Sequence, residues 1–259
     1  MKLLIPALAA GAIFFAPSGR PGTDSAAPPP AEPAPPGAQY GRVPPHFIRN
    51  DGQLAEEVGY YLKGPRGTVY LTGDEVVFDF LSGQAEPPDR PSPPGEEEET
   101  TVSRLVFRLR FSDPDPEAAL EGAKELPGKI NYFIGDRENW RTSIPTYREV
   151  VYRGIYPGIN LVCRLEGANI RYRCTVSPGA DPGRIKFSYS GVDGLEINPD
   201  GDLIVLTPFG GFRTPTPRLR QEIDGEPVEI DGAFVIPDDL TVTLKIAPYD
   251  RALPLIIDF

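Results

Sequence analysis

The sequence predicts an all-β protein: an antiparallel β-sandwich, or two packed β subdomains, with roughly seventeen short strands and little helix. Three observations indicate this class. Apolar residues alternate with Arg or Thr in many short runs, as in strands buried on one face. Gly, Asn and Asp turn signals separate these runs. The chain has 259 residues and is 40% hydrophobic, enough for a large core.

The N-terminus is typical of an export signal, predicted over residues 1–18. Lys2 precedes an apolar run over 3–16, which is too short for a spanning helix of about 20 residues. Small residues favour cleavage after Ser18, although an uncleaved anchor is the alternative. We therefore expect a secreted, periplasmic or cell-surface protein without a transmembrane segment after cleavage. Residues 19–45 are rich in Pro and Ala and predict a disordered linker.

The predicted all-β domain covers residues 46–259 and begins with a meander of three strands, over 58–62, 68–71 and 76–81. A Pro- and Glu-rich insertion at 84–100 follows, which we expect to be disordered. The strand predicted over 102–111 alternates well. Residues 116–124 favour helix and strand equally, because they contain Ala and Leu but also Gly122.

The central stretch, residues 126–176, predicts four strands, over 130–134, 147–152, 161–165 and 170–176. It contains the only two cysteines, Cys163 and Cys174. A two-residue loop at Ala168-Asn169 would set them directly opposite each other, whereas a looser loop would shift the pairing. In an exported protein, two cysteines on adjacent strands predict one disulfide; a pair of buried free thiols is the alternative.

Short strands continue to the C-terminus, with turns at Asn198-Pro199-Asp200-Gly201 and at two Ile-Asp-Gly sequences. The predicted ranges are 184–189, 195–198, 203–207, 211–213, 218–223, 228–230, 233–236, 240–246 and 253–256.

Several segments together resemble the N-terminal domain of unknown function found in bacterial secreted proteins with SBBP or NHL-type β-propeller repeats. These segments begin at Phe47-Ile48-Arg49-Asn50-Asp51-Gly52-Gln53, Leu126-Pro127-Gly128-Lys129-Ile130-Asn131-Tyr132, Trp140-Arg141-Thr142-Ser143, Val151-Tyr152-Arg153-Gly154, Pro178-Gly179-Ala180-Asp181-Pro182 and Tyr249-Asp250-Arg251-Ala252. The resemblance implies a module that precedes propeller repeats, and it brings no catalytic residues. The sequence ends at Phe259 without such repeats, and the cysteine pair is not part of the family pattern.

Catalytic motifs are poorly represented, so we expect no enzymatic activity and no cofactor. His46 is the only histidine, and no Gly-x-Ser-x-Gly or phosphate-binding glycine motif occurs. Paired carboxylates are the remaining route to catalysis, and nothing in their spacing selects two of them. The candidates are Glu149, Glu166, Asp181 and Asp193.

Two kinds of binding residue remain. Acidic residues in turns are candidates for extracellular calcium, although turn propensity alone also explains them. They are Asp113, Asp115, Asp200 and Asp202. Among the aromatic residues, Trp140 and Tyr156 fall in predicted turns and are the candidates to face a ligand, whereas the others are expected in the core.

A formal charge of −11 disfavours nucleic acid as a partner. We therefore expect an exported, non-enzymatic module for interaction, adhesion or assembly at the bacterial cell envelope. A C-terminal edge strand, from Leu253 to Ile257, is expected to bind a protein or cell-surface partner by strand addition. The alternative is a secreted carbohydrate-binding or acid-pair glycan-hydrolysing protein.

Overall fold

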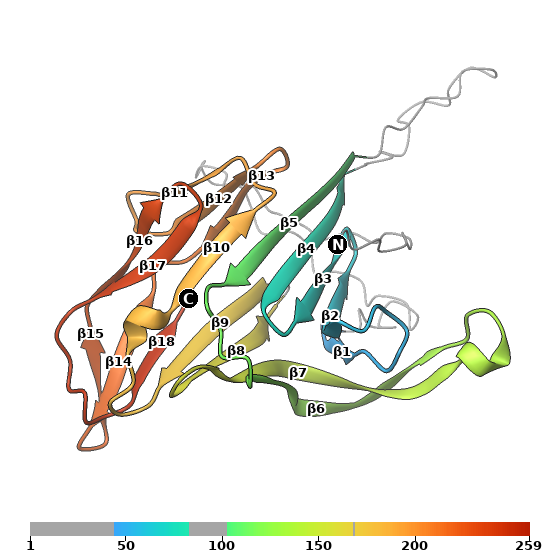
Figure 1. Ribbon diagram of the computed structural model, residues 1–259, viewed down its shortest axis with the longest axis horizontal. Coiled ribbons are helices and arrows are strands. Elements are labelled where there is room, and N and C mark those ends of the chain that lie inside the picture. The colour runs from blue at the N-terminus through green and yellow to red at the C-terminus, as the bar shows by residue number, and fades with distance from the viewer. Residues whose placement is uncertain (1–43, 83–102, 168) are drawn as a thin grey trace, which may run out of the picture.

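A computed structural model describes residues 44–82, 103–167 and 169–259, and it confirms the all-β class (Figure 1). The predicted signal peptide, nearly all of the linker and the insertion at 84–100 lie outside these residues. Fifteen strands form one large antiparallel sheet, three more form a small sheet, and the large sheet does not close into a barrel. No helix in the described ranges is both long and apolar enough to cross a membrane.

The part of the chain that the structure describes contains eighteen strands, compared with the roughly seventeen expected, and two short 3₁₀ segments, η1 (Arg137–Asn139) and η2 (Pro182–Arg184). The strands are β1 (Phe47–Arg49), β2 (Val58–Gly64), β3 (Gly67–Thr72), β4 (Glu75–Ser82), β5 (Ser103–Phe111), β6 (Ala119–Tyr132), β7 (Arg141–Tyr156), β8 (Ile159–Glu166), β9 (Asn169–Val176), β10 (Lys186–Ser190), β11 (Gly194–Ile197), β12 (Leu203–Thr207), β13 (Gly210–Thr214), β14 (Arg218–Ile223), β15 (Glu226–Ile230), β16 (Gly232–Asp238), β17 (Thr241–Ile246) and β18 (Leu255–Asp258).

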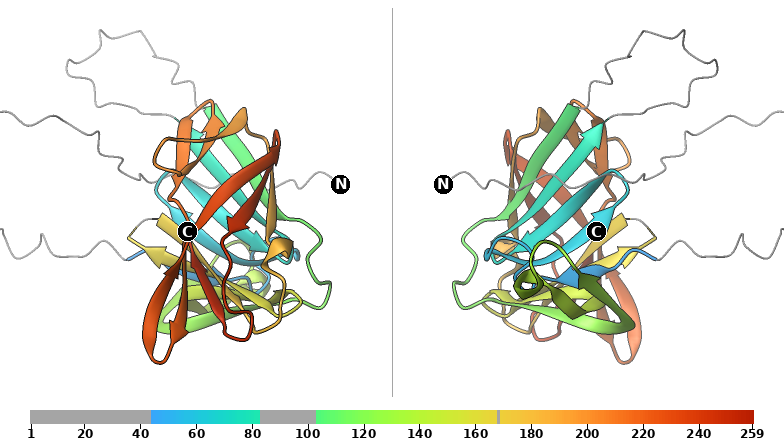
Figure 2. Two further views of the ribbon diagram at one scale, coloured as in Figure 1. Left: turned by 90° about the vertical axis from the view of Figure 1, so that its left-hand side faces the viewer. Right: turned by 90° about the vertical axis from the view of Figure 1, so that its right-hand side faces the viewer.

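The large sheet follows the order β15-β14-β18-β9-β8-β7-β1-β2-β3-β4-β5-β10-β17-β16, and β6 pairs with β7 outside this path. Strand β7 is its centre, since it pairs with β1, β6 and β8. The sheet curls, so that the arm formed by β1 to β5 faces the arm formed by β8, β9 and β18 (Figure 2). Both arms contribute side chains to one core. Tyr152 of the central strand β7 also belongs to it, and its ring centroid lies 4.9 Å from that of Phe111 of β5.

A second, smaller core lies on the other face of β1 to β4 and contains Ile48, Tyr61, Tyr70 and Val77. The hairpin formed by β6 and β7 packs partly against it, through Ile130, Tyr132 and Ile144. The segment 116–124, for which helix and strand were equally favoured, leads into β6. This segment adopts strand conformation because the backbone of β6 pairs with β7 along most of its length.

The C-terminal strand corrects one expectation. Residues 253–257 are not an exposed edge, because β18 lies between β9 and β14 and pairs with both. Leu255 and Ile257 are fully buried in the core. The main strand order ends at β15 and β16 instead, and β6, which pairs only with β7, is a further edge strand. Strand addition at 253–257 is therefore excluded by this register.

Candidate functional site

The longest hairpin carries the most exposed apolar surface of the described residues. Strands β6 and β7 extend beyond the rest of the sheet and end in the η1 turn (Figure 1). Phe133, Ile134 and Trp140 lie in this tip, and their exposed fractions are 60%, 56% and 39%. Of the seven exposed large hydrophobic residues described, three therefore belong to one loop. Clustering of this kind is typical of a contact surface, whereas single exposed apolar residues are ordinary.

Local contacts hold these side chains in a defined arrangement. The rings of Phe133 and Trp140 meet edge to face, with centroids 5.0 Å apart. The indole Nε1 of Trp140 donates to the carbonyl oxygen of Gly135 at 3.3 Å. The guanidinium of Arg137 lies 5.8 Å from the Trp140 ring centroid, within cation–π range. Gly135 supports the turn because its φ of +67° suits glycine. The tip is thus ordered before any partner binds.

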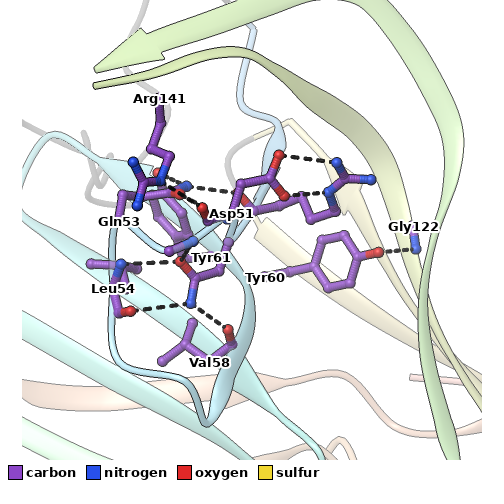
Figure 3. Close-up of polar contacts among 11 residues, drawn as sticks. Asp51, Gln53, Leu54, Val58, Tyr60, Tyr61, Gly122 and Arg141 are labelled. Carbon is purple, nitrogen blue, oxygen red and sulfur yellow. Dashed lines mark hydrogen bonds and ion pairs between the residues drawn. The ribbon is translucent and has the colours of Figure 1, made fainter. Parts of the chain in front are cut away.

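A loop from the start of the domain holds the base of the tip (Figure 3). The Asn50 side chain organises this loop: its Nδ2 donates to the carbonyl oxygens of Ala55 and Val58, and its Oδ1 accepts from the amide of Leu54. The loop presents the carbonyl oxygen of Asp51, which accepts from Arg141 Nε at 2.9 Å.

Arg141 joins this loop to the tip. Another nitrogen of its guanidinium, Nη1, donates to the carbonyl oxygens of Glu138 and Trp140, at 3.1 and 3.2 Å. Gly52, with φ +97°, leaves room for the guanidinium, because a Cβ atom there would lie 3.3 Å from Arg141 Nε. Two segments named in the resemblance, 47–53 and 140–143, are therefore in direct contact. Arg141 therefore fixes the tip relative to the loop at the start of the domain.

A tyrosine pair, in which Tyr61 is buried and Tyr132 partly buried, forms the second anchor of the hairpin. The hydroxyl of Tyr61 on β2 donates to the hydroxyl of Tyr132 on β6 at 2.7 Å. Gln53 Nε2 donates a hydrogen bond to the hydroxyl of Tyr61 at 3.2 Å; both residues are labelled in Figure 3. Burial and the Tyr132 contact raise the pKa of Tyr61 well above its ordinary value, so the Tyr61 hydroxyl stays a neutral hydrogen-bonding group.

The structure separates the two aromatic candidates. Trp140 lies at the exposed tip, but Tyr156 is only 2% exposed, which corrects the expectation that it faces a ligand. Its hydroxyl donates to the carbonyl oxygen of Lys186 at 2.9 Å. Burial raises the pKa of Tyr156 to about 12. Tyr156 is a core residue because β7 continues through it, where the sequence predicted a turn.

Neither pair of calcium candidates belongs to a larger cluster of possible ligand side chains among the described residues. In the described residues, no group of three or more His, Cys, Asp or Glu side chains could hold a metal ion. Asp202 is buried, and its carboxylate accepts from Arg213, Asn198 and the amide of Thr216. The hydrogen bond from Arg213 is the main reason that the pKa of Asp202 lies below its ordinary value. This carboxylate fastens β13 to the turn beside it.

The remaining calcium candidates are turn residues. Asp115 accepts a hydrogen bond from the amide of Glu117, and Asp113 adopts a φ of +50°. Asp200 donates its amide to the side chain of Asn198. Each of these contacts shapes a turn locally.

The carboxylates considered for acid–base chemistry also have local contacts. Glu149 pairs with Lys124, and Glu166 pairs with Arg171. Asp181 accepts from the amide of Gly183 at the start of η2. Asp193 donates its backbone amide to Leu206.

The two cysteines are free and buried, so no disulfide joins them in the structure. The hairpin closes between Glu166 and Asn169, which places Cys163 opposite Tyr172 and Cys174 opposite Leu161. The cysteines are thus diagonal neighbours, with Cβ atoms roughly 7 Å apart in such a geometry, whereas a disulfide requires about 3.8 Å. The loop is no looser than expected, but the turn begins one residue earlier, and this shift separates the cysteines.

Sequence reasoning identified Trp140 but not Phe133 and Ile134 as tip residues. The missed signal is the run Tyr132-Phe133-Ile134-Gly135. Three consecutive apolar residues before a glycine do not fit a strand with one buried face, and here β6 ends at Tyr132.

Comparison with known protein families identifies the family of this chain. The family described as Domain of unknown function (DUF7948) matches residues 47–258, nearly all of the described structure. No curated protein and no solved structure matches the chain.

Proposed function

The chain belongs to the DUF7948 family, and from this premise we propose that it is an exported, non-enzymatic module that binds a protein partner at the bacterial cell envelope. The apolar tip of the β6–β7 hairpin carries the proposal. Trp, Phe and Arg are residue types that dominate the energy of protein interfaces, and Phe133, Trp140 and Arg137 meet here in one ordered loop.

The charges of the tip support a protein partner. Asp136 and Glu138 balance Arg137 and Arg141, so the tip itself carries no net charge. The chain as a whole carries −11 and would be repelled by anionic lipid or nucleic acid. An apolar pocket on a protein suits an uncharged aromatic tip best. Because the tip is already ordered, little conformational entropy is lost when it binds.

The contacts of the carboxylate candidates support a role without turnover. Glu149 and Glu166 each form an ion pair with a basic neighbour, and the Asp181 carboxylate accepts a hydrogen bond at the start of η2. The resemblance to SBBP and NHL-type proteins supports a finer proposal, that the domain precedes propeller repeats in a longer polypeptide. Sequencing the genomic region that follows codon 259 tests that proposal, and an unrelated or intergenic sequence there would argue against it.

Site-specific cross-linking tests the partner proposal. A photoreactive phenylalanine analogue replaces Phe133 in the full chain, and a second protein carries it at Val228, which is also exposed but lies on the edge strand β15. Illumination of cells should join the Phe133 position to one envelope protein and leave the Val228 position without that product.

Adding Trp140→Ser to the first protein should reduce the cross-linked product at least 10-fold, because an interface aromatic contributes about 2 kcal/mol or more. Equal products at both positions, or a product that is insensitive to Trp140→Ser, would contradict the proposal. A glycan array adds a second arm. Glycan binding that is lost in Trp140→Ser would favour the carbohydrate-binding alternative instead.

A further inference from the structure

A groove opens where the large sheet divides into its two arms. Strand β1 pairs with β7 at Thr146 and Tyr147, and β8 pairs with β7 from Glu149 onwards, so the arms diverge at Arg148. The volume of the groove is about 750 Å³, and its apolar wall consists of Pro44, Pro45, Leu126, Ile130 and Leu165. This volume lies within the range of sites that hold drug-sized molecules, so the groove has room for more than one aromatic side chain.

The charged side chains that line the groove are basic. Arg148, Lys129 and His46 contribute to the lining, and no Asp or Glu side chain of the described residues does. Lys129 forms an ion pair with Glu125, whereas none of the ion pairs among the described residues includes Arg148. The groove therefore favours a partner that combines apolar side chains with carboxylates.

The hairpin tip presents this combination of groups. Phe133 and Trp140 are exposed aromatic residues that contact each other. The charges of the tip sum to zero, but they are not equally accessible. Arg141 is turned toward the loop at the start of the domain, whereas Asp136 and Glu138 are exposed and belong to none of the ion pairs in the described ranges. An aromatic pair beside two carboxylates complements an apolar groove with basic side chains.

The tip cannot enter the groove of its own chain. Both belong to the β6–β7 hairpin, and the pairing of Ile130 with Ile144 and of Tyr132 with Arg141 keeps the strands extended between them. The hydrogen bonds of Tyr132 and Arg141 to the start of the domain hold the hairpin in this direction. Because the tip projects beyond the rest of the sheet (Figure 1), it can fill such a groove only on another molecule.

We propose that the occupant of the groove is the hairpin tip of a second copy of this chain. The inference rests on the proposed function, because it identifies the protein partner of the tip as the same protein. Burial of Phe133 and Trp140 against the apolar wall provides most of the affinity, and the carboxylates of Asp136 and Glu138 face Arg148. The tip and the groove are different surfaces, so each contact needs one intact tip and one intact groove.

Photo-cross-linking of the purified protein tests the contact. An isotope-labelled chain that carries the photoreactive phenylalanine analogue at position 133 is mixed with unlabelled, unmodified chain and illuminated. Mass spectrometry should find products that join the labelled tip to unlabelled peptides from residues 44–46, 126–130, 146–148 or 165–167, which line the groove. The same analogue at Val228 should give no such product.

Two variants test the surfaces separately. Phe133→Ser with Trp140→Ser removes the aromatic tip, and Arg148→Glu reverses a charge of the groove at an exposed position. Each should raise the Kd of self-association, measured by sedimentation equilibrium, about 10-fold or more. A mixture of the two variants contains one intact tip and one intact groove, so it should associate more strongly than either variant alone.

Arg66→Glu is the matched control for Arg148→Glu. Arg66 is also exposed, but it lies in the turn between β2 and β3 and does not line the groove. This variant should leave the Kd of self-association unchanged. Circular dichroism should show the same strand content in all variants, so that a change in the Kd reports the contact and not unfolding.

The inference is overturned if the purified chain stays monomeric at every concentration tested, or if its cross-links map outside the groove. It is also overturned if the mixed variants associate no better than each alone, or if Arg66→Glu acts like Arg148→Glu. A monomeric chain whose position 133 still cross-links to a different envelope protein in cells would overturn this inference and leave the proposed function standing. No product in either setting would overturn both.

Discussion

Asp258 shows how a single carboxylate organises the outer face of the sheet. It accepts hydrogen bonds from Arg173 and Arg220, both at 2.7 Å, and Arg164 lies 3.6 Å away. These arginines come from β9, β14 and β8, so one residue of β18 links four strands. Partial burial raises the pKa of Asp258, but the hydrogen bonds from Arg173 and Arg220 lower it further, to below its ordinary value of 3.8.

A depressed folded-state pKa gives a definite pH dependence. The stabilisation is fully present above the ordinary pKa of 3.8 and is lost as the pH falls through the lower folded-state pKa. We expect Asp258→Asn to lower the free energy of unfolding by about 1–3 kcal/mol at pH 7, because three arginines lose their anionic partner. As the pH falls below the ordinary pKa of 3.8, the difference in unfolding free energy between the two proteins, measured by urea titration, should shrink.

The control for Asp258 is Glu121→Gln. Glu121 pairs with Arg153, and both side chains are about half exposed. Exposed pairs contribute about 0–1 kcal/mol, so this variant should differ little from the unmodified protein at either pH. An Asp258→Asn protein as stable as the control at pH 7 would show that the arginine cluster is not structural.

The buried cysteines give a second residue-scale prediction. Burial raises the pKa of Cys174 to about 12 and that of Cys163 still further, and only the thiolate reacts readily. In the folded protein, purified without reductant, Ellman's reagent should modify neither thiol over minutes. After unfolding in guanidinium it should detect two thiols per chain. No thiol after unfolding would mean that a disulfide forms and that the β8–β9 register differs.

The sequence could place both cysteines on facing strands, but it could not fix their register. A shift of the turn by one residue decides between opposite and diagonal positions. Gly167 and Asn169 both suit turns, so turn chemistry favoured neither register. Gly167 takes the left-handed conformation here, with φ +60°.

At the scale of elements, the β6–β7 hairpin depends on a glycine packed against two tyrosines. The amide of Gly122 donates to the hydroxyl of Tyr60 at 2.6 Å, as Figure 3 shows. A Cβ atom at Gly122 would lie 2.7 Å from the ring of Tyr147. We expect Gly122→Ala to reduce the free energy of unfolding by about 1–3 kcal/mol, because the tyrosine must move.

The same strand offers a matched control. Gly128 has nothing within 4 Å of its Cβ position, so Gly128→Ala should change stability by less than about 0.5 kcal/mol. Hydrogen exchange of residues 133–140 supplies a second measurement, since a displaced β6 should release the tip. Equal melting temperatures for the two variants would show that Tyr147 yields without cost.

The alternation of apolar and polar residues was sufficient to predict most strands, but not that residues 119–132 form one long strand, β6. The runs over 58–62, 68–71, 161–165 and 170–176 correspond to β2, β3, β8 and β9. Strand β6 has no such alternation, because one of its edges is unpaired and many of its residues are exposed. Its conformation is imposed by pairing with β7, which is tertiary information.

At the scale of the molecule, the position of β18 gives a further prediction. Removing residues 253–259 would delete a strand between β9 and β14 together with the buried side chains of Leu255, Ile257 and Phe259. We expect the shortened chain to lose cooperative thermal unfolding, as followed by circular dichroism, because the core is opened along its middle. A cooperative transition near that of the full chain would contradict the observed strand order.

A pair of point variants controls for effects of chain length. Ile257 is fully buried, while its neighbour Ile256 points to the other face and is partly exposed. Ile257→Ser should therefore destabilise the protein far more than Ile256→Ser, by about 2–5 kcal/mol in the first case.

Strand order could not be predicted from sequence, because it depends on contacts between distant segments. Nothing in the alternation of 253–257 indicates that it pairs with 173–176. Likewise, Phe80 and Phe212 belong to different sheets and meet only after both have formed. The exposure of Trp140 could be predicted from sequence, because a local turn exposes it. The burial of Tyr156 could not, because it depends on how far β7 continues.

The central place of β18 also constrains when this protein can fold. Strands β9 and β14 can be joined only after β18 has been synthesised, because β18 lies between them. Strand β1 can pair with β7 only after β7 has been synthesised, about 100 residues later. Such long sequence separations slow folding. Under the proposed export, the chain would cross a narrow translocation channel in extended form and would complete its sheet only on the far side.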